Sequence, residues 1–503
     1  MTSSQHRKIL WDSGNKVLLV GAILFFLYHL LTLAISPLPW FDETFFASMT
    51  ASFNSTGELN LLAAPFAYDG EMLLYGPVYF WITSLFTQIL GLDIVSFRLP
   101  GVIFGFLSIL AFYKIARLFL PKQITCLAVV ALSFDPLFNA NMHSGRMDMV
   151  ALFFALASIF IYQKHVSDMK GSLFGPFLIS GIIFAVALLT TPRIGILLIA
   201  FVVCQLSAIS QKSIARLLQL TVFAGSIGIT YIAWILFSFG SFSGFLQYYL
   251  GFLEYLGGGY YSYPVQQLPL TVIMVVSSIV GITLDFKRFL SPLVQLSLTS
   301  VALFYSVVYD TGQYSVIIIP FKYAIIGSAV MILYDKVHSV NKAYSVILRS
   351  NFLGIILLGN VLLFTMKVIT IYISSETRNP VYISSFVKRN IPPQSRVIGD
   401  ESHFYAVTKA SSEFQYIHLF KKDLEREEYQ RNVYNYDYII WSDRLQRDYP
   451  ALLDVYKRKS KIIEVAEFKN NKNKKLAFAE RALKSLNVPV DITYNCVIYK
   501  RLK

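Results

Sequence analysis

The stretch VLLVGAILFFLYHLLTLAI, residues 17–35, decides the class of fold to which this chain belongs. It reaches the roughly 20 mainly apolar residues that a helix needs to cross a bilayer. The basic stretch His6-Arg7-Lys8 precedes it, and Ser36-Pro37-Leu38-Pro39-Trp40 follows it. Because no small-residue cleavage site follows, the stretch is predicted to be a first transmembrane helix rather than a cleaved signal peptide.

Composition extends this prediction to the rest of the chain. Of the 503 residues, 55% are hydrophobic and 15% are charged, and the mean hydropathy is +0.55. Ordinary globular domains are about 45–50% apolar. The net charge of +14 is explained by cationic loops beside anionic lipid headgroups, so no nucleic-acid partner is predicted. The three cysteines show neither a disulfide framework nor zinc spacing.

Ten further apolar runs predict about eleven transmembrane helices in all. Five basic clusters, from Lys114/Arg117/Lys122 to Lys336/Lys342/Arg349, alternate with the runs. Together with the basic N-terminus, they mark every second loop as cytoplasmic. Residues 77–90 are too short for a span and are predicted to form a juxtamembrane helix, which leaves a first external loop at about 36–97. The ten runs lie near 98–120, 124–141, 148–163, 173–190, 194–210, 217–239, 267–284, 290–308, 314–334 and 351–374.

The composition changes at about residue 375. The last 129 residues hold 24 of the 44 Lys and Arg and 16 of the 30 Asp and Glu. This predicts a transmembrane domain at 1–374 and a soluble α/β domain at 375–503, with strands at 397–400, 438–441 and 496–499. An odd number of spans places the second domain outside the cytoplasm, and the expected location is the plasma membrane, which in a bacterium is the inner membrane.

Two acidic sites lie on the predicted external face. Asp42 and Glu43 follow the first span among aromatic residues, where desolvating a carboxylate is costly. Asp148, next to Arg146, begins a later span. The plain alternatives are a hydrated loop for the first pair and a local ion pair for the second. Carboxylates from two loops facing one cavity would suit acid/base chemistry on a sugar, so Asp42, Glu43 and Asp148 are the predicted catalytic residues. Asp42 and Asp148 would also suit a divalent cation, Mg²⁺ or Mn²⁺.

Four motifs lie in about the first 200 residues: Phe41-Asp42-Glu43, YGPVYFW at 75–81, FRLPGVIFG at 97–105 and GRMD at 145–148. Together with weaker matches at 191–195 and 314–320, they resemble the GT-C fold transferases related to protein O-mannosyltransferases and to the lipid A aminoarabinose transferase. The resemblance implies an inverting glycosyltransferase that takes its sugar from a polyprenyl phosphate, with Asp42 as the general base. The family usually has a His/Glu-Pro-Pro-like element where this chain has Tyr75-Gly76-Pro77, which leaves the acceptor open: lipid, polysaccharide or protein.

Phosphate and sugar contacts are predicted from the chemistry of such a reaction. The departing lipid phosphate needs fixed cations, and the candidates are Arg146, Arg193 and Lys322. Lys322 lies inside an apolar run, where a cation is a functional candidate, although it can also snorkel to the interface. The acceptor or sugar contacts are predicted to include Tyr75, His143, Tyr260 and Tyr261, of which the last two also suit an interfacial aromatic belt.

Two other functions remain open at this stage. An oligosaccharide ligase or polymerase would use a lipid-diphosphate donor and would have a similar sequence pattern. A secondary transporter or flippase would place ionisable or broken-helix sites near mid-membrane within a repeated architecture, and neither feature is clear in the sequence.

Overall fold

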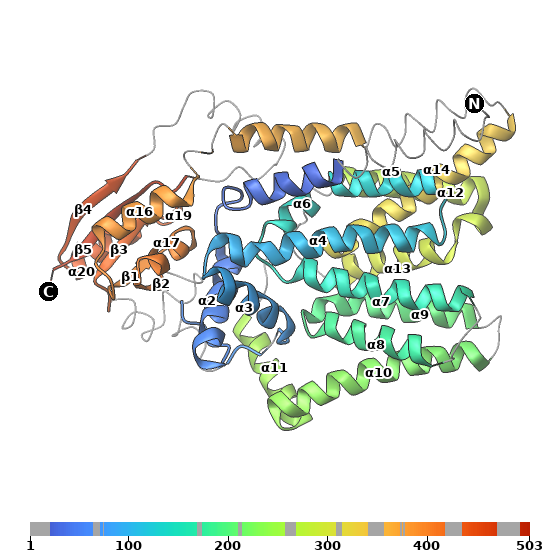
Figure 1. Cartoon of the computed structure of the whole chain (residues 1–503), viewed down its shortest axis with the longest axis horizontal. Coiled ribbons are helices and arrows are strands. Elements are labelled where there is room, and N and C mark those ends of the chain that lie inside the picture. Colours follow the sequence, from blue (N-terminus) through green and yellow to red (C-terminus); the bar gives the residue numbers. More distant parts are fainter. Residues whose placement is uncertain are drawn as a thin grey trace.

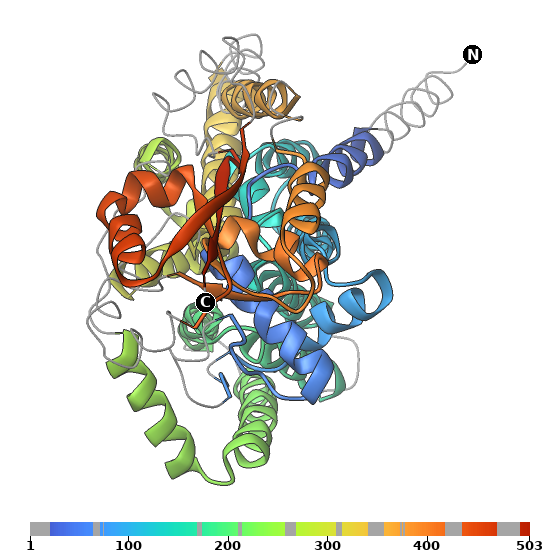
Figure 2. The ribbon, with the colours of Figure 1, turned by 90° about the vertical axis from the view of Figure 1, so that its left-hand side faces the viewer.

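The computed structural model describes residues 21–63, 71–73, 75–168, 174–209, 214–256, 268–307, 314–340, 357–372, 375, 378–417, 435–469 and 493–502. These residues form a long bundle of helices with a small sheet domain at one end (Figure 1). Figure 2 views the molecule from the side of the sheet domain and shows its strands in front of the ends of the bundle helices.

The bundle consists of apolar helices, as predicted. Five helical segments are long and apolar enough to cross a membrane: α4 (Ile94–Arg117), residues 148–166 of α7 (Asp148–Asp168), α10 (Ile214–Phe239), α12 (Leu268–Phe289) and the segment Tyr314–Val337, which comprises η3 (Tyr314–Ile318) and most of α14 (Ile319–Val340). Shorter apolar helices occupy the remaining predicted runs. They are Gly21–Thr32, α8 (Gly175–Leu188), η1 (Pro192–Ile194) with α9 (Gly195–Ile209), α13 (Pro292–Val307) and Leu357–Tyr372. The helical membrane fold is confirmed, and the number of eleven spans stays a prediction.

One predicted run is broken in the structure. Residues 124–141 contain α5 (Lys122–Ser133) and α6 (Pro136–Met142), which are bent by 61° relative to each other. Asp135 caps α6 by accepting from the backbone N–H groups of Leu137 and Phe138. Pro136 follows at the first helical position, where its fixed φ suits a helix start but prevents α5 from continuing.

The segment at about 36–97, predicted to be the first external loop, contains two helices that lie at the sheet-domain end of the bundle (Figure 1). They are α2 (Phe41–Thr56) and α3 (Val78–Leu90), which pack on each other. At 13 residues α3 is too short for a span, as predicted. The first turn of α2 carries Asp42 and Glu43, and its N-cap residue, Trp40, makes no side-chain hydrogen bond to the helix end.

The C-terminal part is a five-stranded sheet with the order β2-β1-β3-β5-β4. Strands β2, β1 and β3 are parallel, whereas β5 pairs antiparallel with both β3 and β4. The predicted strands coincide with β1, β3 and β5. The elements are α16 (Pro380–Asn390), β1 (Arg396–Gly399), η4 (Glu401–His403), α17 (Phe404–Lys409), β2 (Glu413–Tyr416), β3 (Tyr438–Ser442), α19 (Asp443–Asp448), α20 (Pro450–Lys459), β4 (Ile462–Phe468) and β5 (Cys496–Arg501).

The two parts share one hydrophobic core. Phe46 of α2, Tyr79 of α3 and Phe97 of α4 belong to the same buried cluster as Tyr405 and Tyr416 of the sheet domain. This continuity holds the sheet domain against the start of α2, where the predicted site residues begin. The remaining helix of the first half, α11 (Phe242–Leu256), follows α10 at the edge of the bundle (Figure 1).

Candidate active site

A buried guanidinium joins the two acidic sites. Arg146 lies in the turn between α6 and α7, and its Nε donates to Oδ2 of Asp148 at 2.6 Å. Its Nη1 donates to Oδ2 of Asp42. The side chain of Asp148 is 0% exposed and that of Asp42 is 27% exposed, so Asp42 is the carboxylate of this pair that an external molecule can reach.

The charge of Arg146 is fixed by these neighbours. Burial alone would lower its pKa, but Asp148 and Asp42 raise the pKa of Arg146 well above its ordinary value. The guanidinium therefore stays protonated and holds the two carboxylates on either side of it. Asp148 is also the first residue of α7, where the positive end of the helix dipole favours a negative charge.

The turn that carries Arg146 depends on Gly145. This glycine has φ of +59°, and a Cβ atom there would lie 2.7 Å from Cγ of Glu43 and 2.9 Å from Cδ1 of Phe97. The conformation and the close approach both require glycine. The hydroxyl of Tyr79 donates to the Gly145 carbonyl at 2.6 Å and fixes the peptide next to Arg146.

Tyr314 brings a second cation to the site. The guanidinium carbon of Arg193 lies 3.8 Å from the centre of the Tyr314 ring, and that of Arg146 lies 4.5 Å from it. Arg193 donates to the hydroxyl of Tyr75 at 3.3 Å. Within the described residues no carboxylate forms an ion pair with Arg193, and its Nη1 is buried without a hydrogen bond. Since a half-buried cation with a buried, unbonded nitrogen is stabilised by a counter-charge, this side of the cluster is suited to an anion.

Glu43 points elsewhere. Its two oxygens accept from Nε and Nη2 of Arg98 at 2.8 and 2.7 Å, and both side chains are fully buried. Burial raises the pKa of Glu43 and the Arg98 guanidinium opposes that rise. Arg98 also donates to the carbonyls of Leu33 and Pro37, both at 2.8 Å. The structure thus gives Glu43 a structural ion pair, although the sequence suggested a catalytic role.

His143 is likewise enclosed. Its Nδ1 lies 2.8 Å from the carbonyl of Ser36, which can only accept, so Nδ1 carries the proton. Its Nε2 lies 2.6 Å from Nδ1 of His29, which then donates to it. With both ring nitrogens engaged and the side chain 0% exposed, the predicted contact between His143 and a sugar has no support in the geometry.

The remaining predicted residues are Tyr75, Lys322, Tyr260 and Tyr261. Tyr75 lies beside Arg193, as described above. Lys322 of α14 is fully buried and donates to Thr271 of α12 at 3.0 Å and to Tyr305 of α13 at 2.8 Å, partners that differ from those of Arg146 and Arg193. Tyr260 and Tyr261 lie outside the described residues.

The carboxylates of the cluster are already paired with a cation. In the described part of the chain, no group of three or more His, Cys, Asp and Glu residues could hold a metal ion. Asp42 and Asp148 share Arg146, so a positive charge already lies between them. Mg²⁺ demands near-octahedral oxygen coordination. This donor set therefore does not fit the predicted Mg²⁺ or Mn²⁺.

Several residues of this site were not identified from the sequence. Trp40, Tyr79 and Tyr405 were not singled out, and aromatic residues are too common here to stand out by type. Arg98 was noted only as part of a motif. It is a cation at the start of a long apolar helix, so the reasoning that drew attention to Lys322 applied equally to it.

Comparison with known proteins agrees with this architecture. Residues 75–238 match the family model described as dolichyl-phosphate-mannose-protein mannosyltransferase. The crystal structure of apo ArnT from Cupriavidus metallidurans superposes with a TM-score of 0.63 at 15% identity, covering 97% of this chain and 98% of that chain. This chain has a GT-C fold. The predicted resemblance to the mannosyltransferase and ArnT superfamily is thereby confirmed.

Other proteins share the GT-C fold with this chain. ArnT bound to undecaprenyl phosphate gives a TM-score of 0.59 at 14% identity, over 95% of this chain and 98% of that chain. The Archaeoglobus fulgidus oligosaccharyltransferase AglB, in complex with an inhibitory peptide and a dolichol-phosphate, gives 0.53 at 13% identity, over 84% and 70%. An uncharacterized protein of Aquifex aeolicus is 25% identical over 202 residues, which is 39% of each chain, so the match spans well under half of that relative.

Proposed function

We propose that this protein is an inverting glycosyltransferase that moves a sugar from a polyprenyl-phosphate donor to an acceptor on the extracytoplasmic face of the membrane. The observation that carries the proposal is the cluster around Arg146. It combines a reachable carboxylate, Asp42, with a half-buried cation, Arg193, that has no ion-pair partner among the described residues. A base and an anion-binding group are the two parts that such a transfer requires.

Asp42 acts as the general base. The acceptor nucleophile attacks the anomeric carbon of the donor sugar while Asp42 removes its proton, and the bond from that carbon to the phosphate oxygen breaks. The attack comes from the face opposite the phosphate, so the configuration inverts and no covalent sugar–enzyme intermediate forms. Arg146 holds one oxygen of Asp42 and so orients the carboxylate.

Arg193 stabilises the departing phosphate. Its planar guanidinium suits phosphate oxygens, and in a buried site each charge-assisted hydrogen bond is stronger than in water. Tyr75 and Tyr314 hold this guanidinium by a hydrogen bond and by ring contact. Lys322, deeper in the bundle beside Thr271 and Tyr305, is the second candidate for a contact with the donor lipid.

The donor class has support from proteins with the same fold. ArnT binds undecaprenyl phosphate and AglB binds a dolichol-phosphate. Both are polyprenyl phosphates whose tails can remain in lipid while the phosphate enters the protein. A lipid, a polysaccharide or a protein remains open as the acceptor. We place the C-terminal domain on the same extracytoplasmic side, because it packs on α2, and the N-terminus in the cytoplasm.

The decisive variant is Asp42→Asn, which keeps the size of the side chain and removes its basicity. We expect it to abolish transfer while the protein stays folded and still binds the donor lipid. Glu58→Gln is the matched control, because Glu58 is an exposed carboxylate in the same loop. The measurement is turnover by purified protein with polyprenyl-monophosphate sugars. Near-normal turnover by the Asn variant would exclude Asp42 as the base, and activity only with polyprenyl-diphosphate sugars would favour the ligase reading.

A further inference from the structure

We infer that the C-terminal sheet domain sets the orientation of Asp42 through Tyr405 and Tyr416, which hold the first turn of α2. The inference rests on the proposed function, since it concerns the direction of the proposed base. Tyr405 is 4% exposed and Tyr416 is 1% exposed, so neither hydroxyl is placed to touch an acceptor. Both are positioning residues that act on Asp42 through its neighbours.

Three consecutive residues of α2 point in three directions, because successive helix residues are about 100° apart. Asp42 faces Arg146. Glu43 faces Arg98 and also accepts from the hydroxyl of Tyr405 at 3.3 Å. Thr44 faces Tyr416. Contacts with the sheet domain thus hold Glu43 and Thr44. Because a helix turn is rigid, these contacts also restrict the direction in which Asp42 points.

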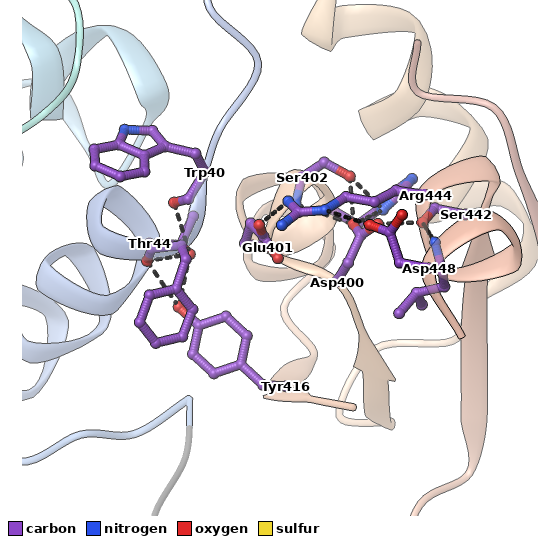
Figure 3. Close-up of polar contacts among 12 residues, drawn as sticks. Trp40, Thr44, Asp400, Glu401, Ser402, Tyr416, Ser442, Arg444 and Asp448 are labelled. Atoms are coloured by element: carbon purple, nitrogen blue, oxygen red, sulfur yellow. Dashed lines mark hydrogen bonds and ion pairs between the residues drawn. The ribbon is translucent and has the colours of Figure 1, made fainter. Parts of the chain in front are cut away.

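Of the two contacts with the sheet domain, the one that Tyr416 makes is the shorter. Its hydroxyl lies 2.6 Å from Oγ1 of Thr44, across the boundary between α2 and the sheet domain (Figure 3). Its ring centre lies 5.3 Å from that of Phe41, one turn earlier on the same face of α2. Its backbone N–H donates to the carbonyl of Ala63 at 2.9 Å, so strand β2 is tied to the first external loop as well.

Tyr405 contributes from α17, and the same helix is fixed at its other end. Lys409, the last residue of α17, forms an ion pair with Asp93. Asp93 is the N-cap of α4, the helix that carries Arg98. One short helix of the sheet domain therefore contacts Glu43 directly and also contacts the start of α4, the helix that carries Arg98.

The start of α2 needs such support. The first four N–H groups of a helix have no partner within the helix, and a side-chain cap commonly satisfies one of them. Trp40 provides no such bond. Its indole instead donates to the carbonyl of Ser144 at 3.0 Å, in the turn next to Arg146. Without the sheet domain, the turn that carries the base would be a weakly held helix end.

The test removes single hydroxyls and leaves the rings in place. We expect Tyr416→Phe and Tyr405→Phe each to lower kcat, and the double variant to lower it on the order of tenfold or more, because small displacements of a catalytic group are costly. The KM for the donor lipid should change less than twofold, since Arg193 is untouched. Tyr382→Phe is the matched control, an exposed tyrosine of α16 in the same domain.

A double-variant cycle makes the test specific to the contact. Thr44→Val in the Tyr416→Phe background should lower kcat no further than Tyr416→Phe does alone, because both changes remove one interaction. Thermal midpoints are recorded for every variant. A lower midpoint with an unchanged kcat would show that the tyrosines only stabilise the fold, and it would overturn the inference. A rise in donor KM with an unchanged kcat would also overturn it.

Two outcomes distinguish failure of the inference from failure of the proposed function. If Asp42→Asn is inactive while the tyrosine variants turn over like the wild type, only the inference fails. If Asp42→Asn retains turnover, the base is misassigned, and the inference fails with it.

Discussion

At the scale of single residues, the arrangement of charge around Tyr314 determines what the cluster can hold. Arg146 is neutralised by Asp42 and Asp148, whereas Arg193 lies against the same ring with a tyrosine hydroxyl as its hydrogen-bond acceptor. Two guanidinium groups on one ring repel each other unless anions compensate them. A bound phosphate would supply the missing negative charge on the Arg193 side.

Arg193→Ala is therefore expected to weaken binding of a polyprenyl phosphate by about tenfold to a hundredfold, the range for a hydrogen bond to a charged group. The affinity of Arg193→Lys should lie between those of the wild type and Arg193→Ala, because Lys keeps the charge but lacks the planar guanidinium. Binding to purified protein in detergent measures the dissociation constant, with the exposed Arg389→Ala as control. Lys322→Ala tests the second candidate in the same assay. Unchanged affinity in both Ala variants would remove these residues from the phosphate site.

Gly145 offers a second test at this scale, with an internal control. Gly145→Ala forces a side chain into a left-handed conformation and against Glu43 and Phe97, so we expect a loss of about 1–3 kcal/mol in stability and reduced turnover through displacement of Arg146. Gly57 has φ of +80°, and a Cβ atom added there would have nothing within 4 Å, so Gly57→Ala should cost stability without affecting kcat. Equal kinetic effects of the two variants would contradict this account.

At the scale of elements, the turn after β1 links three elements of the sheet domain. Asp400 accepts from Ser402 and from Ser442 at the end of β3, and it lies 3.0 Å from Nδ1 of His403. The neighbouring Glu401 pairs with Arg444 of α19 (Figure 3). These contacts occupy the carboxyl ends of the parallel strands β1 and β3 and join them to the helices that follow.

The stability of this turn should depend on pH at both ends of the range. Burial alone would lower the pKa of His403, but Cys496 and Asp400 raise it to about 10. Protonated His403 contributes fully to stability below its ordinary pKa of 6.5, and this contribution is lost as the pH rises towards 10. Burial would raise the pKa of Asp400, but His403, Ser402 and Ser442 lower it, so that contribution is lost only below pH 3.8.

We therefore expect the thermal midpoint to decline from pH 6.5 to 10, and His403→Asn to flatten that decline. The measurement is the midpoint at each pH in one detergent, with the exposed His165→Asn as control. A decline of the same slope in the His403 variant would assign the alkaline loss to other groups.

Elements with a strong periodic or apolar signal could be predicted from the sequence, and the others could not. The buried strands β1, β3 and β5 stand out as apolar runs. Strand β2, Glu413–Tyr416, is as short as β1, but it includes the polar residues Glu413 and Gln415. Strand β4 is half-exposed with a bulge between Glu464 and Ala466, so neither β2 nor β4 stands out as an apolar run. The break at Asp135-Pro136 did carry a signal, since an N-cap residue before a proline is typical of a helix start.

At the scale of the whole molecule, the candidate site depends on pairings between distant parts of the chain. Asp42 and Asp148 could be proposed as partners because both were assigned to the external face. The contacts of Thr44 with Tyr416 and of Glu43 with Tyr405 join residues 372 and 362 positions apart. No local pattern encodes such pairings, because they follow from how a complete domain packs on the helix ends.

The tie between Tyr416 and Ala63 also has a consequence for solubility. Strand β2 is an edge strand of the sheet, and unpaired backbone groups at an edge can pair with strands of other molecules. The loop that contains Ala63 covers part of this edge, whereas β4 at the opposite edge carries Glu464, Glu467 and a bulge. A fragment that begins at residue 375 would expose the β2 edge. It should therefore self-associate through β2, whereas the full-length chain should not.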